Sequence, residues 1–178
     1  MKNSLLILLI LTVGAVGIFV FGSQTVSTRA QSKDDVALAK QFVGMWRLVS
    51  RTQRFVDGTT RQHPNSVAYI IYTDTDRMCF VGMDPNRPKW KSETTPTPEE
   101  AISGITGFGG YCATVEVHAK DGFVVHHVEI ERVPNIVGRN RKRWFTFEGP
   151  NRLALRVDTP ELTKPVVEDA LVWERVQK

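Results

Sequence analysis

Two adjacent histidines, His126 and His127, carry side chains suited to proton transfer or metal binding near neutral pH. They lie in residues 123–133, a run rich in Val, Ile and Phe that predicts a β-strand. Neighbouring side chains on a strand point to opposite faces of a sheet, so the two imidazoles do not share one metal ion. The pair therefore predicts two separate environments, one on each face.

His126 falls on the more apolar face of this strand, together with Val124, Val128 and Ile130. An imidazole buried among apolar side chains needs a hydrogen-bond partner. We expect that partner to be the hydroxyl of Tyr111 or Tyr69, an internal water, or a polar group of a ligand. In the last case His126 anchors the ligand. Alternatively, His126 and Tyr111 move protons during a reaction.

The opposite face of the same hairpin carries four groups able to bind a metal or to act as acid and base: Glu116, His118, His127 and Glu129. If Asp121 and Gly122 form a two-residue turn, Val117 faces His126 and Glu116 faces His127. The first interpretation of the facing pair is an ordinary cross-strand contact on the sheet surface. The alternative is a surface metal or acid-base site.

The chain has two cysteines, Cys79 and Cys112, and each lies in a strand-like run. In an oxidising compartment they are able to form a disulfide; the alternative is two separate buried thiols. Neither belongs to a CxxC pair or to the ligand spacing of a structural zinc site. We therefore expect no metal, no cofactor and no catalytic cysteine.

The first 30 residues have the pattern of a signal peptide. Lys2 precedes an uncharged apolar run over residues 5–21, and Ala30 follows as a small residue at a cleavage point. We expect export to the periplasm or the medium. The alternative is an uncleaved anchor in the inner membrane, which would be the chain's only contact with a membrane.

The charge of the remaining chain is close to balanced. Without residues 1–30 there are 21 basic and 19 acidic side chains, and the formal charge falls from +4 to +2. We therefore expect no nucleic-acid partner, since such proteins are usually far more basic. The basic run over residues 139–143 is interpreted as a solvated turn. Its alternative role is to steer an anionic headgroup or fatty carboxylate toward a cavity, with Arg143 reaching inside.

Residues 31–43 predict a short lead-in helix, and residues 44–178 predict one β-domain. Eight runs have strand composition and are separated by turn signals: residues 45–55, 66–73, 77–83, 111–118, 123–133, 142–148, 152–157 and 168–177. A second short helix is predicted at about 98–106, between the third and fourth strands, where Thr97 and Glu100 form a capping box. Eight strands joined by tight turns predict an antiparallel up-and-down barrel.

The two ends of this domain carry residues that resemble the lipocalin arrangement. Gly44-Met45-Trp46 begins the first strand, and Trp173-Glu174-Arg175 ends the last. The resemblance implies a calycin-type barrel whose closed end holds Trp46, with Arg175 lying across the indole. Cation–π attraction fits that arrangement.

More of the chain resembles the bacterial and fungal lipocalin-like domain proteins. The matching stretches include Tyr69-Ile70-Ile71-Tyr72-Thr73, Val125-His126-His127-Val128-Glu129 and Pro134-Asn135-Ile136-Val137-Gly138, in the order of that family. The family carries no agreed catalytic set, so the resemblance implies the fold and little more about function.

The barrel predicts a binding protein for a small apolar molecule. The residues expected to contact that molecule are Leu48, Tyr69, Ile71, Phe80, Tyr111, Val115, His126, Ile130 and Arg143. Two alternatives remain open. One is a cofactor-free isomerase, cyclase or hydrolase working through His126 and Tyr111 in the cavity. The other is an interaction module whose barrel is filled by its own side chains. The sequence gives no prediction of the oligomeric state.

Overall fold

The computed structural model describes residues 31–63, 67–158 and 165–177 of the chain. The predicted signal peptide, residues 1–30, lies outside the described residues. Within the described part, no helix is long and apolar enough to cross a membrane.

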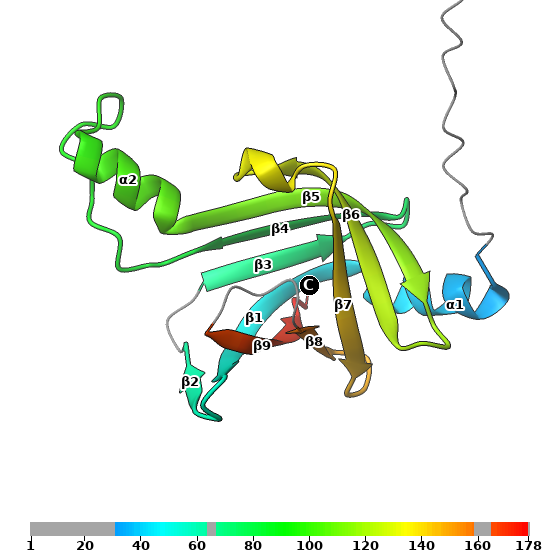
Figure 1. The fold of residues 1–178 in the computed structure, drawn as a ribbon. Coiled ribbons are helices and arrows are strands. Elements are labelled where there is room, and N and C mark those ends of the chain that lie inside the picture. Colours follow the sequence, from blue (N-terminus) through cyan, green and yellow to red (C-terminus); the bar gives the residue numbers. More distant parts are fainter. Residues whose placement is uncertain (1–30, 64–66, 159–164, 178) are drawn as a thin grey trace, which may run out of the picture. The chain divides into compact units, whose positions relative to one another are not determined.

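The described chain is mostly β-structure, with two α-helices and one 3₁₀ turn (Figure 1). The elements in order are α1 (Lys33–Phe42), β1 (Gly44–Phe55), β2 (Thr60–Gln62), β3 (Val67–Tyr72), β4 (Arg77–Met83), α2 (Pro98–Thr106), β5 (Phe108–His118), β6 (Phe123–Glu131), η1 (Pro134–Ile136), β7 (Asn140–Phe147), β8 (Arg152–Asp158) and β9 (Val166–Arg175).

Eight of these strands close into an antiparallel barrel. β1 pairs with β3 on one side and with β9 on the other, and each later strand pairs with the next. The closing pair runs from Trp46 opposite Arg175 to Phe55 opposite Val166. The short strand β2 is an addition, because among the described residues it pairs only with β1. The predicted closed barrel is therefore confirmed, while β2 and η1 modify the purely up-and-down order.

Helix α1 begins at a capping box and is tied to the barrel. The Ser32 side chain accepts from the Asp35 backbone N–H, and the Asp35 carboxylate accepts from the Ser32 backbone N–H. The second Asp35 oxygen accepts from the backbone N–H of Ala119, in the loop between β5 and β6, at 2.8 Å. This places the last residue of the helix, Phe42, in the barrel core, where its ring packs on Tyr72 and Phe145.

The end of the barrel beneath α1 is closed by Trp46 and Arg175. The Trp46 side chain is fully buried, and its Nε1 donates to the Phe42 carbonyl at 2.7 Å. The Arg175 guanidinium lies 4.0 Å from the Trp46 ring centroid and donates to the carbonyls of Gln41, Val43 and Pro150. A Cβ at Gly44, whose φ is +134°, would stand 2.6 Å from Arg175 Nη1, which explains why glycine precedes the tryptophan by two positions.

Replacing Arg175 with methionine is expected to lower the free energy of unfolding by about 2–3 kcal/mol. The variant loses the cation–π contact and three hydrogen bonds to carbonyls that close α1 and the β7–β8 turn region. Urea unfolding followed by circular dichroism measures the change. Arg47→Met is the control, because Arg47 is exposed and its ion pair with Glu174 is 3.8 Å long, so its loss should stay below about 1 kcal/mol. Equal losses in the two variants would contradict the proposed role of Arg175.

The β5–β6 hairpin corrects the predicted register. His118 pairs with Phe123, so the loop has four residues and Val115, not Val117, faces His126. A bulge between Cys112 and Ala113 shifts the pairing again, because Ala113 faces Val128 whereas Cys112 faces Ile130. The alternation on β6 therefore reverses beyond Val128. Ile130, predicted to be interior, is 66% exposed.

Strand β3 corrects a second expectation. Its inward residues are Ala68, Ile70 and Tyr72, so Tyr69 and Ile71 lie on the outer face. Ile71 is 40% exposed. Both faces of this strand are apolar or aromatic, and the sequence alternation therefore does not distinguish the inner face from the outer.

Cys79 and Cys112 form a disulfide across β4 and β5. They are direct partners in the strand register, with Cα atoms 4.1 Å apart. Their neighbours Met78 and Ala113 point into the core, so the disulfide lies on the outer side of the sheet. It links the two strands that lead to and from α2.

Candidate ligand cavity

The barrel contains a cavity of about 790 Å³. Its apolar wall includes residues from six strands: Leu48, Ala68, Ile70, Phe80, Tyr111, Leu155, Val157, Leu171 and Trp173. Most of these residues belong to the buried core. The cavity is therefore a space inside the barrel, and its size is within the usual range for small-molecule sites.

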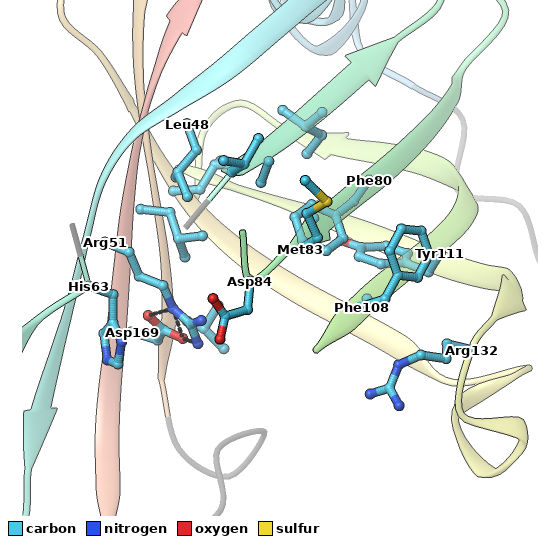
Figure 2. Close-up of a pocket in the computed structure, with 18 of the residues that line it drawn as sticks. Leu48, Arg51, His63, Phe80, Met83, Asp84, Phe108, Tyr111, Arg132 and Asp169 are labelled. Atoms are coloured by element: carbon cyan, nitrogen blue, oxygen red, sulfur yellow. Dashed lines mark hydrogen bonds and ion pairs between the residues drawn. The ribbon is translucent and has the colours of Figure 1, made fainter. Parts of the chain in front are cut away.

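A part-buried ion pair between Arg51 and Asp169 forms the β1–β9 side of the cavity (Figure 2). Arg51 Nε and Nη2 donate to the two carboxylate oxygens of Asp169 at 2.9 and 2.5 Å, and Gln53 Nε2 adds a 3.3 Å bond. A bulge in β1 leaves Val49 without a partner in β9. Because of this extra residue, the inward alternation passes from Leu48 to Arg51, which turns the arginine into the barrel.

The β6–β7 side of the cavity is lined by four arginines: Arg132, Arg139, Arg141 and Arg143. Figure 2 shows Arg132 across the pocket from the Arg51–Asp169 pair. Arg143 is the most enclosed, with 9% exposure, and its Nη1 donates to the Lys142 carbonyl at 2.7 Å. Arg141 lies over the Tyr111 ring, 4.7 Å from the centroid, and pairs with Glu131 at 2.9 Å.

The structure brings together only part of the predicted contact set. Four predicted residues line the cavity: Leu48, Phe80, Tyr111 and Arg143. Two are buried elsewhere in the core, Val115 and His126. The outward-facing residues Tyr69, Ile71 and Ile130 are corrected as above, because the face of β3 and the bulge in the β5–β6 hairpin were not foreseen.

Behind the cavity wall, His126 is held between two tyrosines. Its Nδ1 lies 2.9 Å from the Tyr111 hydroxyl and its Nε2 lies 3.1 Å from the Tyr72 hydroxyl. A neutral imidazole has one donor and one acceptor, so one tyrosine donates to the ring and the other accepts from it. Tyr111 is thus a partner, as expected. The second tyrosine partner is Tyr72, whereas Tyr69 was the one expected. Of the two tyrosines, Tyr111 also lines the cavity.

The stability of the fold is expected to fall as the pH drops below about 6.5. Burial, and then the positive charges of Arg143 and Arg141, hold the pKa of His126 well below its usual 6.5. The unfolded chain therefore binds a proton that the folded chain excludes. The stability gained by keeping His126 neutral in the fold is fully present above about pH 6.5. It is lost at up to about 1.4 kcal/mol per pH unit as the pH falls.

Urea unfolding of the wild type and His126→Gln between pH 7 and pH 5 measures this effect. The glutamine variant should be less stable at pH 7 and should show a shallower pH dependence. His63→Gln is the control, since burial lowers the pKa of His63 as well but that ring is only partly buried. A slope that disappears with His63 and persists without His126 would assign the pH dependence to the wrong histidine.

The polar cluster on the outer face forms through Glu116. One carboxylate oxygen lies 3.0 Å from His118 Nε2 and the other lies 3.1 Å from His127 Nε2. Glu129 pairs instead with Arg77. The contact with His127 is diagonal, because Glu116 directly faces Val125. Among the described residues, no group of three or more His, Cys, Asp or Glu side chains is arranged to hold a metal ion.

Trp173 is a cavity residue that was predicted only as part of the Trp173-Glu174-Arg175 motif at the end of the last strand. It lines the cavity and is 2% exposed, and its buried indole N–H has no acceptor among the described residues. The available signal was the period-2 pattern of β9, which sets Asp169, Leu171 and Trp173 on one face. Arg175 continues the same face toward Trp46.

A closed eight-stranded barrel with a tryptophan and an arginine at one end and a cavity within it defines the class of lipocalin-type barrels. The lipocalin-like domain family matches residues 43–176, and the chain belongs to this family. Such a barrel suggests ligand binding in general.

No curated protein matches the sequence closely enough to count as a relative. Two similar solved structures are designed proteins. A redesigned β-barrel has 11% identity and a TM-score of 0.40, and the match covers 78% of this chain and 95% of that one. A de novo designed fluorescence-activating β-barrel has 11% identity and a TM-score of 0.38, and the match covers 78% and 96% of the two chains.

Proposed function

We propose that this protein is an exported binding protein for a small molecule with an apolar body. The observation that carries the proposal is the cavity of about 790 Å³ walled by core residues such as Leu48, Phe80 and Leu155. A molecule whose apolar surface leaves water for this wall gains about 25 cal/mol for each Å² buried.

Two observations support export. Residues 1–30 have the composition of a signal peptide. The disulfide between Cys79 and Cys112 suits an oxidising compartment, where such bonds persist. Both are compatible with a carrier that meets its ligand outside the cytoplasm.

Tryptophan fluorescence tests the proposal, because Trp173 lines the cavity. The protein is produced with its own N-terminal segment, recovered as the host processes it, and titrated with fatty acids, retinoid-like molecules and aromatic probes. We expect saturable quenching by at least one class at micromolar concentration. An emission that none of the three classes changes would contradict the proposal.

A catalytic role is the second candidate, and one observation favours it. The Tyr111 hydroxyl belongs to a cavity residue and is hydrogen-bonded to the buried, neutral His126 at 2.9 Å, so the pair is able to relay a proton to a bound molecule. Mass spectrometry of molecules extracted from the wild type and from His126→Gln tests this role. An isomerase or cyclase would yield product from one and substrate from the other, whereas identical molecules would exclude it.

A further inference from the structure

We propose that the ligand carries a carboxylate, bound at the cavity rim by Arg132 and Arg139. This inference rests on the proposed binding function and specifies the polar end of the molecule. It is carried by the positions of the lining arginines, by the lack of an ion pair at Arg132 and Arg139 among the described residues, and by the excess of lining arginines over lining acids.

Three arginines occupy every second position from the residue just before β7: Arg139, and then Arg141 and Arg143 within the strand. Residues at this spacing point to the same face of a strand, and all three line the cavity. Successive members are about 7 Å apart along the strand. We call this set the arginine row. It leads from the exposed Arg139 inward to the buried Arg143.

Arg132 adds a fourth guanidinium from the other end of the β6–β7 connection. The connection is held against the barrel, since the Arg132 N–H donates to the Gly110 carbonyl and the Arg139 carbonyl accepts from Val128. Both backbone bonds fix the points from which the two side chains reach the cavity rim.

Two carboxylates near the cavity are already paired with arginines. Asp169 accepts a double hydrogen bond from Arg51, and Glu131 pairs with Arg141. Asp84 also lines the cavity and keeps its charge, since it accepts from the neutral backbone N–H of Asn86 at 2.8 Å, but five lining arginines outnumber the two lining acids. Among the described residues, Arg132 and Arg139 have no ion pair. The rim therefore has a surplus of positive charge.

The surplus of positive charge at the rim favours an anionic ligand. Two guanidiniums beside an apolar cavity attract an anion more strongly than they would in open water, because the apolar wall focuses the field. Each guanidinium presents a planar fork of donors that matches a carboxylate. The apolar wall then takes the rest of the molecule, so an amphipathic carboxylate fits both parts of the site.

A matched pair of ligands tests the inference: dodecanoate and its methyl ester, both titrated by tryptophan fluorescence. We expect the acid to bind about tenfold more tightly at low salt, and its advantage to shrink as the salt concentration rises. In the double variant Arg132→Gln/Arg139→Gln, the affinity for dodecanoate should fall about tenfold while that for the ester stays within about twofold. Both residues are exposed, and unchanged binding of the ester reports that the cavity is intact.

Arg47→Gln/Arg54→Gln is the control, because it removes the same charge from exposed arginines that do not line the cavity. It should leave the binding of both ligands unchanged. Equal affinity for acid and ester would overturn the carboxylate inference and leave the binding function standing. An equal loss of dodecanoate affinity in the control variant would also overturn it. If neither ligand bound, the inference would fail, whereas the proposed function would still be decided by the retinoid-like molecules and aromatic probes.

Discussion

Replacing Trp46 with alanine is expected to lower the free energy of unfolding by about 3–5 kcal/mol, the largest effect of any substitution considered. The indole is fully buried, with its ring 6.2 Å from that of Phe147 and beneath the Arg175 guanidinium. Its removal empties the closed end of the barrel and leaves the Phe42 carbonyl without its side-chain donor. Urea unfolding by circular dichroism measures the loss.

Trp90→Ala provides the control for this prediction. Trp90 is 41% exposed and lies before α2, outside the barrel core. The same change of residue type should therefore cost about 1 kcal/mol or less. If the two variants were equally stable, the indole of Trp46 would not be the plug of the closed end.

Replacing Gly109 with phenylalanine is expected to weaken ligand binding by at least about a hundredfold while keeping the fold. Gly109 lines the cavity, and a Cβ added there would meet Phe80 at 3.7 Å, an ordinary contact. The new ring would thus occupy the space proposed for the ligand. A loss of that size corresponds to about 2.7 kcal/mol of binding free energy. Titration of the variant by tryptophan fluorescence provides the measurement.

Val81→Phe is the matched control, because it adds a similar ring on the same pair of strands but on the outer face. Val81 is 41% exposed and pairs with Gly110, the neighbour of Gly109. Binding should be unchanged in this variant. Unchanged binding in Gly109→Phe as well would mean that the ligand does not occupy the barrel.

The features that the sequence predicted correctly are set by local chemistry or by strong end motifs. The capping box at Thr97 and Glu100 starts α2, and the short helix predicted within residues 31–43 is α1. Trp46 and Arg175 meet as the resemblance implied, since each lies on the inward face next to the β1–β9 closure. Clear alternation also placed Tyr111, Val115 and His126 inside.

The incorrect predictions arise where alternation is interrupted or uninformative. A bulge adds one residue and reverses every later side chain on its strand. The bulge opposite Cys112 turned Ile130 outward, and the bulge at Val49 turned Arg51 inward. On β3, Tyr69 and Tyr72 have similar character, and the packing of Tyr72 on Phe42 and its hydrogen bond to His126 place it on the inner face.

The basic run over residues 139–143 shows a third kind of difficulty. A charged run is usually a solvated turn, yet the structure begins β7 at Asn140 and directs alternate arginines into the cavity wall. The alternative in which Arg143 reaches inside agrees with its place in the cavity lining. The additional arginines Arg132, Arg139 and Arg141 required the three-dimensional path of the β6–β7 connection.

Native mass spectrometry shows most directly whether the barrel holds a small molecule. The protein is recovered from its own compartment, its intact mass is measured under gentle conditions, and any bound molecule is then released by denaturation. We expect each chain to release one molecule with an apolar body and an acidic group. The same molecule should be absent from Gly109→Phe prepared in the same way. A wild-type protein that is reproducibly empty, and that still takes up no carboxylate or ester when these are added, would contradict the proposed binding function.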